Sequence, residues 1–244
     1  MKIGIIGAGN IGTTLARKLA ACGHEVKLAN SKGPQSIQNL ANEIGAHAVT
    51  KEDAVSEVDV VILSIPFANY PDLKQTLSNV PEKTVVIDTS NYYPGRDGAI
   101  KEVDDGKPES VWVSEQIGCP VVKAWNAVLA ATLADKGQPA GSSTRIALPV
   151  AGGNITAEAI AQDLVEDTGF IALAAGSLED SWRQQPGTPA YCTELTLPEL
   201  KLALNTADKA RAPQNRDALI AKFMAPGSQF THEQIVATNR AMTA

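Results

Sequence analysis

Short apolar runs alternate with helix-compatible segments along the first half of the chain. The runs at 2–6, 25–29, 46–49, 59–64, 84–88 and 121–125 are typical of buried strands, and helical patterns lie between them at 13–22, 36–44, 51–55, 69–77 and 110–117. Near-continuous apolar runs such as DVVILS are expected of parallel strands that are covered on both faces. The alternation predicts an α/β fold with a doubly wound parallel sheet in the order 3-2-1-4-5-6.

The second half of the chain is less regular. A polar loop is expected at 92–108 and a linker at 135–143, strands at 145–150 and 170–174, and helices at 156–167, 198–210, 213–224 and 232–242. The last three helices have modest apolar faces and alternating charge. We expect these tail helices to form a cover or a dimer contact.

The strongest motif is G-x-G-x-x-G, which connects the first strand to the first helix as Gly7-Ala8-Gly9-Asn10-Ile11-Gly12. In this setting Gly7 permits the tight turn, Gly9 lets a pyrophosphate approach the backbone, and Gly12 lets the helix pack closely on the strand. The helix N-terminus adds free N–H groups for phosphate. We predict that Gly7, Gly9, Asn10, Ile11 and Gly12 hold the pyrophosphate of a dinucleotide. A glycine-rich turn that binds nothing is the alternative.

The end of the second strand indicates which dinucleotide is bound. An NAD site usually places Asp or Glu there, against the ribose 2′-hydroxyl. This chain has Asn30, Ser31 and Lys32 instead, so no carboxylate repels a 2′-phosphate. Ser31 can donate a hydrogen bond and Lys32 supplies positive charge, and these residues predict NADP(H). Under the alternative, Lys32 is a solvated loop lysine.

Further candidates follow from the rule that ligands lie over the carboxyl ends of parallel strands. Ser64, Ile65 and Pro66 follow the fourth strand and are expected to line the dinucleotide. Asn91 follows the fifth strand and Asn126 the sixth, so both are candidates to touch the nicotinamide or the acceptor. Turn chemistry is the alternative for Asn91.

Composition excludes several classes of function. A net charge of −6 and a pI of about 5.1 disfavour nucleic acid and anionic membrane as partners. No apolar run approaches the roughly twenty residues that span a bilayer, and the N-terminus is not a signal peptide. The three cysteines are scattered and no metal-ligand spacing is present, which favours a reducing cytoplasm and a site without metal.

Several segments together resemble one family. They are the glycine loop, Asn30-Ser31-Lys32-Gly33-Pro34, Ser64-Ile65-Pro66, Val122-Lys123-Ala124-Trp125-Asn126 and Ala175-Gly176-Ser177-Leu178, in that order. The chain from residue 1 to about residue 180 is similar to the NADPH-dependent coenzyme F420 reductase family. That family includes the archaeal F420:NADP oxidoreductases and the NADPH-binding domains of STEAP-type metalloreductases.

The resemblance implies an NADP-binding Rossmann-type domain, residues 1–178, with a small helical C-terminal extension, residues 179–244, packed on it. It further implies a homodimer in which NADPH gives a hydride to a flavin- or deazaflavin-like acceptor. The protein would position the two rings, and no catalytic acid or base is identified in the sequence. F420 or a flavin would then be the second substrate. This small-molecule acceptor is the partner that the resemblance implies for the protein.

One residue keeps other interpretations open. Asn126 stands where the archaeal F420 enzymes have a histidine, whereas STEAP-type domains have an asparagine there. Reduction of a small carbonyl or imine substrate, or non-enzymatic NADPH sensing, would use the same pocket.

Four further residues have weaker assignments. In the tail, Arg183, Gln185 and Tyr191 are candidates to reach the acceptor cleft. Trp125, at the end of the sixth strand, is expected to be a core residue.

Overall fold

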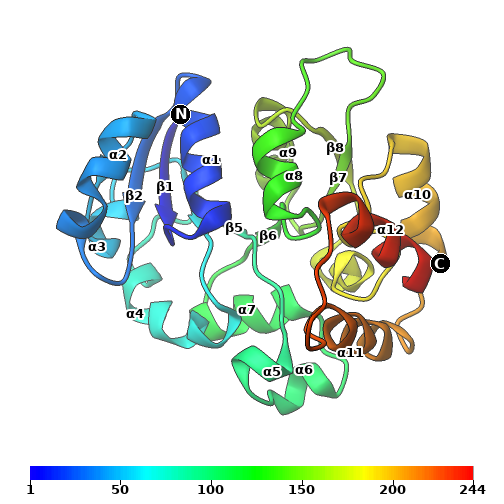
Figure 1. Ribbon diagram of the computed structural model, residues 1–244. Helices are drawn as coiled ribbons and strands as arrows, with labels where there is room; N and C mark the ends of the chain where they lie inside the picture. The colour runs from blue at the N-terminus through cyan, green and yellow to red at the C-terminus, as the bar shows by residue number, and fades with distance from the viewer. Residues whose placement is uncertain (244) are drawn as a thin grey trace.

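A six-stranded parallel sheet lies at the centre of the computed structural model, which describes residues 1–243 (Figure 1). Its order, β3-β2-β1-β4-β5-β6, confirms the predicted doubly wound topology. The strands are β1 (Lys2–Ile6), β2 (Glu25–Ala29), β3 (His47–Ala48), β4 (Val60–Leu63), β5 (Val85–Asp88) and β6 (Val122–Lys123).

Helices connect these strands and cover both faces of the sheet. The α-helices of this part are α1 (Asn10–Ala21), α2 (Gln38–Ile44), α3 (Lys51–Ala54), α4 (Lys74–Leu77), α5 (Pro94–Asp97), α6 (Lys101–Asp104), α7 (Glu109–Ile117) and α8 (Ala130–Asp135), with 3-10 helices η1 (Pro34–Ile37) and η2 (Phe67–Leu73). One apolar core joins the sheet to α1, α2, α8 and the later helix α9 (Ile155–Asp167). A second core joins the other face to α3, η2, α4 and α7.

Alternation along the strands decides which side chain enters which core. Ile62 and Ile87 belong to the first core, whereas Val61 and Val86 belong to the second. The same period places Val122 in the first core and turns Lys123 toward the α7 face. Asp88, the register partner of Lys123, ends β5 on that face as well. The pleat thus brings a buried acid and a buried base side by side.

A second, two-stranded parallel sheet follows the first. It consists of β7 (Ala147–Val150) and β8 (Ile171–Ala174), with α9 between them. Lys123 and Ala151 form an antiparallel bridge that joins the end of β7 to β6. The two later strands predicted from the sequence are therefore present, but they form a separate sheet and do not widen the main one.

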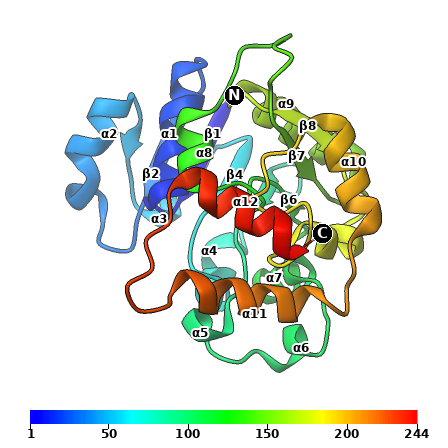
Figure 2. The same ribbon diagram turned by 45° about the vertical axis from the view of Figure 1, so that its right-hand side comes forward.

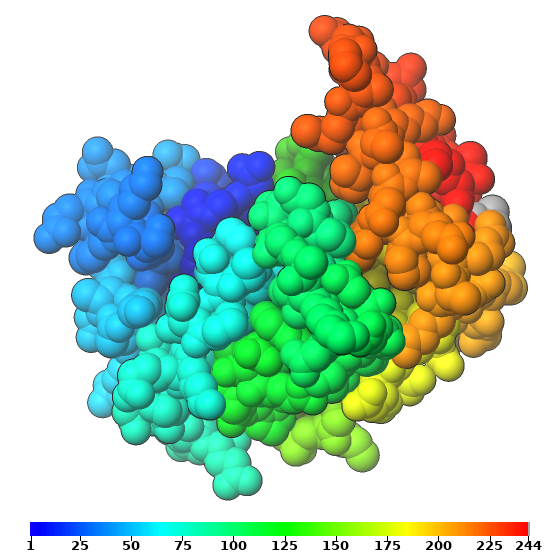
Figure 3. All heavy atoms as spheres, turned by 90° about the horizontal axis from the view of Figure 1, so that it is seen from below, coloured from blue at the N-terminus to red at the C-terminus, as the bar shows by residue number. Residues whose placement is uncertain are grey.

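The tail folds back over this second sheet. It contains η3 (Leu178–Gln184), α10 (Leu197–Thr206), α11 (Ala212–Phe223) and α12 (His232–Thr243). Side chains of α10 share a small apolar core with β7. Helix α11 lies beside the segment that carries α5 and α6 (Figures 2 and 3). Helix α12 begins beside α8, where His232 lies 3.4 Å from the hydroxyl of Thr132. The end of the chain therefore reaches elements that follow β5 and β6.

Two local predictions need correction, and two short elements were not predicted. The stretch 69–77 is mostly 3-10 helix, because Pro71 lies inside η2 and cannot donate a backbone hydrogen bond. The expected loop at 92–108 contains the short helices α5 and α6. Helix α8 and the 3-10 helix η3 were not predicted, because each is too short to show a clear apolar period.

Neither a membrane-spanning helix nor a metal site is found in the part of the chain that is described. No helix within residues 1–243 is long and apolar enough to cross a bilayer. No group of three or more His, Cys, Asp or Glu side chains in this range has the arrangement of a metal site.

The contact between β1 and α3 yields a test of the fold. A Cβ at Gly4 would lie 1.6 Å from the carbonyl oxygen of Ala54, so Gly4→Ala must push the helix from the sheet. We expect a loss of about 1–3 kcal/mol in the free energy of unfolding, measured by urea titration. Gly153→Ala is the control, since no atom lies within 4 Å of the added methyl group. Equal stability of the two variants would contradict the packing.

Candidate functional site

The glycine loop between β1 and α1 has the shape that its motif predicts. Gly7 has φ +116°, and a Cβ there would lie 2.0 Å from the carbonyl oxygen of Ser64. A Cβ on Gly12 would lie 1.9 Å from the carbonyl oxygen of Gly7. At Gly9, by contrast, no atom lies within 4 Å of an added Cβ. Two glycines thus permit tight packing, and the third leaves open space above the loop.

That open space fits a pyrophosphate. Helix α1 begins at Asn10, directly after Gly9, and no side chain caps its N-terminus. The N–H groups of a first helical turn have no partner within the helix and carry partial positive charge. The first turn of α1 contains no acidic residue that would repel an anion. The residues present therefore fit a dinucleotide, which would place its phosphates against Gly9, Asn10 and Ile11.

The end of β2 is polar and carries no carboxylate. The side-chain oxygen of Asn30 accepts a hydrogen bond from the backbone N–H of Lys32 at 3.1 Å, and its amide donates to Ser36 at 2.8 Å. Asn30 therefore shapes the turn. Ser31 and Lys32 are exposed beyond it. Their side chains are free to meet a ligand group at this corner, as the prediction of a 2′-phosphate requires.

A cleft of about 380 Å³ runs over the carboxyl ends of the central strands. It is lined by Gly9, Asn10, Ile11, Ser64, Ile65, Pro66, Thr89, Ser90, Asn91, Tyr93, Arg96, Trp125, Asn126, Val128, Leu129, Ala130, Tyr191 and Cys192. The structure thus brings together eight residues predicted from the sequence, from Gly9 to Asn126. Gly7 and Gly12 pack beneath the loop, and Asn30, Ser31 and Lys32 are not among the residues that line this cleft.

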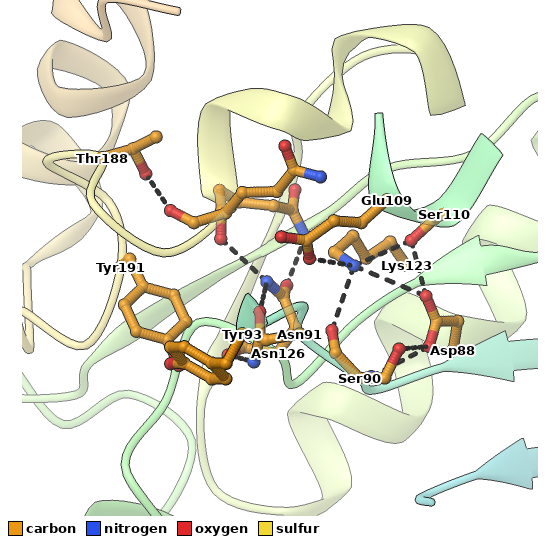
Figure 4. Close-up of polar contacts among 12 residues, drawn as sticks. Asp88, Ser90, Asn91, Tyr93, Glu109, Ser110, Lys123, Asn126, Thr188 and Tyr191 are labelled. Carbon is orange, nitrogen blue, oxygen red and sulfur yellow. Dashed lines mark hydrogen bonds and ion pairs between the residues drawn. The ribbon is translucent and has the colours of Figure 1, made fainter. Parts of the chain in front are cut away.

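Asn91 and Asn126 are tied to each other. The amide of Asn126 donates to the Asn91 side-chain oxygen at 3.0 Å and to the Gln184 carbonyl at 2.8 Å, and the amide of Asn91 donates to the Asn126 carbonyl at 2.9 Å. Gln184 donates back to Asn126 at 2.9 Å. This amide cluster closes one wall of the cleft and joins the ends of β5 and β6 to η3 (Figure 4). Contact of Asn91 and Asn126 with a nicotinamide stays a prediction.

The far end of the cleft is aromatic and basic. The hydroxyl oxygens of Tyr93 and Tyr191 lie 2.5 Å apart, and Arg96 lies over the Tyr93 ring. Of the three tail candidates only Tyr191 lines the cleft, because Arg183 pairs with Asp180 on η3 and Gln185 lies in another pocket. Sequence reasoning missed Tyr93 and Arg96. Their position directly after the fifth strand was the available signal.

Two other lining residues behave as core residues. Trp125 is buried, and its indole N–H donates to the hydroxyl of Thr168 at 3.1 Å, as expected for a residue of the core. It has φ +56°, which a residue with a large side chain adopts only when its surroundings enforce it. Cys192 is also buried, and burial raises the pKa of its thiol to about 12. A thiol with this pKa is not a nucleophile near neutral pH.

A charged cluster lies buried behind the amide cluster. Lys123 is fully buried, and its Nζ lies 3.4 Å from a carboxylate oxygen of Asp88 and 3.6 Å from one of Glu109. The same ammonium donates to the hydroxyl of Ser110 at 2.8 Å and to the carbonyl of Ser90 at 3.1 Å (Figure 4). This cluster fixes the end of β5 next to the cleft. The acid that ends the fifth strand was the one sign of this cluster in the sequence.

The two carboxylates of this cluster differ in protonation. Burial by itself would raise the pKa of Asp88, but Lys123 and hydroxyl donors such as Ser110 and Ser90 outweigh it, and the pKa lies below its ordinary value. Burial raises the pKa of Glu109 to about 7, although Lys123 opposes this shift. Asp88 is therefore the ionised partner of Lys123 at neutral pH, and Glu109 titrates near neutrality.

Comparison with known proteins gives a consistent assignment. The sequence model of the family described as coenzyme F420-dependent NADP oxidoreductases matches residues 2–92. The chain is 38% identical over 104 residues to the protein YjhV of Escherichia coli (strain K12), a match that covers 43% of this chain and 76% of that protein.

Solved structures agree with the fold. A hypothetical protein, SMa0349, from Sinorhizobium meliloti superposes with a TM-score of 0.70 and 31% identity, over 80% of this chain and 95% of that one. A protein assigned as an F420-dependent NADP reductase, from Arthrobacter sp. FB24, superposes with a TM-score of 0.59 and 21% identity. That superposition covers 73% of this chain and 86% of the other. The second likeness supports the fold alone.

The two roles of the loop glycines, room for a phosphate at Gly9 and close packing at Gly12, can be distinguished by substitution. We expect Gly9→Ala to weaken NADPH binding at least about tenfold, because the added methyl group occupies the approach of the pyrophosphate. Its free energy of unfolding should stay within about 0.5 kcal/mol of the parent. Gly12→Ala should lower both the affinity for NADPH and the free energy of unfolding, because its Cβ would lie 1.9 Å from the carbonyl oxygen of Gly7. Full NADPH affinity in Gly9→Ala, measured by calorimetry, would contradict the assignment.

Glu109 should make the stability depend on pH. The unfolded carboxyl loses its proton near pH 4.5, whereas the folded one holds it to about pH 7. The folded state binds more protons in that window, so stability should fall as pH rises through it, by at most about 3 kcal/mol. Asp88 has a lowered pKa, so its contribution to the free energy of unfolding is lost only as the pH falls below this window.

Chemical denaturation at pH 4.5, 5.5, 6.5 and 7.5 measures this slope. Glu109→Gln should flatten the curve, because the amide has no proton to lose. Glu115→Gln, on the same helix but half exposed, should keep the slope of the parent. If Glu109→Gln and the parent show the same slope, Glu109 does not titrate in this window.

Proposed function

Because the chain belongs, through its N-terminal Rossmann-type part, to the family of coenzyme F420-dependent NADP oxidoreductases, we propose that it transfers a hydride between NADPH and a flavin- or deazaflavin-like acceptor. The nicotinamide cofactor supplies the hydride in such a reaction. The protein binds it, orients it and excludes water. The proposal extends the family assignment to an acceptor class.

One observation carries this proposal. Gly9, above which the space is open, lines the same cleft as Asn91 and Asn126. A dinucleotide held at the glycine loop would therefore extend its nicotinamide toward the carboxyl ends of β5 and β6, where dinucleotide-binding folds place it. The polar turn at Ser31 and Lys32, without an acid, supports NADP(H) as the dinucleotide.

A second candidate is the reduction of a small carbonyl or imine substrate. The paired phenols of Tyr93 and Tyr191 favour it, since such a reduction needs a proton as well as a hydride. Both candidates share the cofactor and differ in the acceptor.

Calorimetric titration of the protein with NADPH and NADH side by side tests the cofactor. Absorbance at 340 nm then follows NADPH oxidation with FMN, FAD, F420 and a panel of ketones and imines. Turnover with a flavin or F420 supports the first candidate, and turnover with the panel alone supports the second. NADPH binding without turnover would indicate a sensor, and no dinucleotide binding would overturn the proposal.

Reversal of charge at Lys32 tests the selection of the 2′-phosphate. We expect Lys32→Asp to weaken NADPH binding at least about tenfold and NADH binding less than about twofold, because only NADPH carries the phosphate. Lys222→Asp, a change of the same charge at an exposed position on α11, is the control and should leave both affinities unchanged. Equal loss for NADPH and NADH would rule out this role of Lys32.

A further inference from the structure

The acceptor end of the cleft is closed by two tyrosines from distant parts of the chain. Tyr93 follows β5, and Tyr191 lies in the tail, 98 residues later. Figure 4 shows the two rings side by side, next to Asn91 and Asn126. Both tyrosines line the same cleft as the glycine loop. They therefore lie where an acceptor would meet the nicotinamide.

This phenol pair retains one proton for a ligand. Two hydroxyl groups carry two protons, and the bond between them, 2.5 Å between oxygens, uses one. Tyr93 is the better donor of the other, because Arg96, 5.2 Å from the centre of its ring, stabilises its anion. Burial raises the pKa of both phenols, so both hold their protons near neutral pH.

Arg96 is the one permanently charged side chain among the described residues that line the cleft. Its Nε and Nη2 donate to Asp97 at 3.0 and 2.8 Å, and Nη2 also donates to the carbonyl of Asn91 at 2.6 Å. Within residues 1–243, Nη1 forms no hydrogen bond to the protein. The side chain is 50% exposed, so this edge of the guanidinium is available to a ligand.

We propose that the acceptor is an organic anion, whose charged group Arg96 binds and which Tyr93 protonates as it is reduced. The inference rests on the proposed function and names its substrate class. The acceptor gains a hydride from the dihydronicotinamide at its electrophilic atom, and a proton from Tyr93 at the oxygen or nitrogen to which the displaced electron pair moves, which is the adjacent atom in a C=O or C=N group and a conjugated ring nitrogen in a flavin. It is reduced by two electrons while NADPH becomes NADP⁺. Tyr191 donates its hydrogen bond to the Tyr93 oxygen, which then recovers a proton from solvent.

Matched pairs of acceptors test the anionic group. FMN and riboflavin differ by a phosphate, and 2-oxobutanoate and 2-butanone differ by a carboxylate. We expect the anionic member of the pair that is reduced to have a kcat/KM at least about tenfold higher. The pair that reacts also distinguishes a flavin from an oxo acid.

Substitutions then assign the roles. Arg96→Met should lower kcat/KM for the anion to that of its neutral partner, and Arg96→Lys should restore part of the preference. Tyr93→Phe should lower kcat at least about tenfold and abolish the solvent deuterium effect on kcat, whereas Tyr191→Phe should act less strongly. The affinity of each variant for NADPH should equal that of the parent, which separates these effects from misfolding.

Binding of the same four compounds to the NADP⁺ complex, measured by calorimetry, separates the inference from the proposed function. An anion preference that disappears in Arg96→Met, with no turnover, would support the anion site and overturn hydride transfer. Equal binding or no binding of all four compounds would overturn the role of Arg96. Turnover in Tyr93→Phe within twofold of the parent would overturn the role of Tyr93.

Discussion

The buried ammonium of Lys123 is the constraint on which the rest of the structure depends. A buried charge is costly unless it is paired and hydrogen-bonded, so the elements around Lys123 must stay where they are. Its side chain faces Asp88 of β5 and Ser110 of α7, while its backbone forms the bridge to Ala151 at the end of β7. One residue therefore joins the last two strands of the main sheet, the helix between them and the second sheet.

This constraint passes directly to the wall of the cleft. One oxygen of Asp88 accepts from Tyr70 and from the backbone and hydroxyl of Ser90, and the other from Ser110 and Lys123. The turn after β5 is thereby fixed, and Asn91 beyond it meets Asn126. Because these amides are engaged with each other and with η3, they serve rigidity first. In the proposed reaction, the groups left for an acceptor are the phenols of Tyr93 and Tyr191 and the guanidinium of Arg96, which line the same cleft.

The sequence was most informative where chemistry is local. The strand order, the glycine loop and the helix after it were predictable, because apolar period and the G-x-G-x-x-G spacing act over a few residues. Ser64, Ile65 and Pro66 were predicted because they follow a strand, and they line the cleft. The pairing of Lys123 with Asp88 was not found, because it depends on the register of two strands 35 residues apart. The bridge between Lys123 and Ala151, which connects the second sheet to the first, likewise joins residues far apart in the sequence.

The same contrast separates the two halves of the cleft. The predicted cofactor half comes mainly from one continuous stretch, β1 to Lys32, to which the end of β4 adds Ser64, Ile65 and Pro66. The acceptor half needs the tail, because Tyr191 must reach Tyr93 across 98 residues and Gln184 must reach Asn126 across 58. The matched family model ends at residue 92, just before Tyr93. Relatives that share the cofactor half can thus differ in the acceptor half without any change in the glycine loop. In the proposed reaction the acceptor is therefore set by the residues after β5 together with the tail, and the cleft there is lined by the phenols of Tyr93 and Tyr191 and the guanidinium of Arg96.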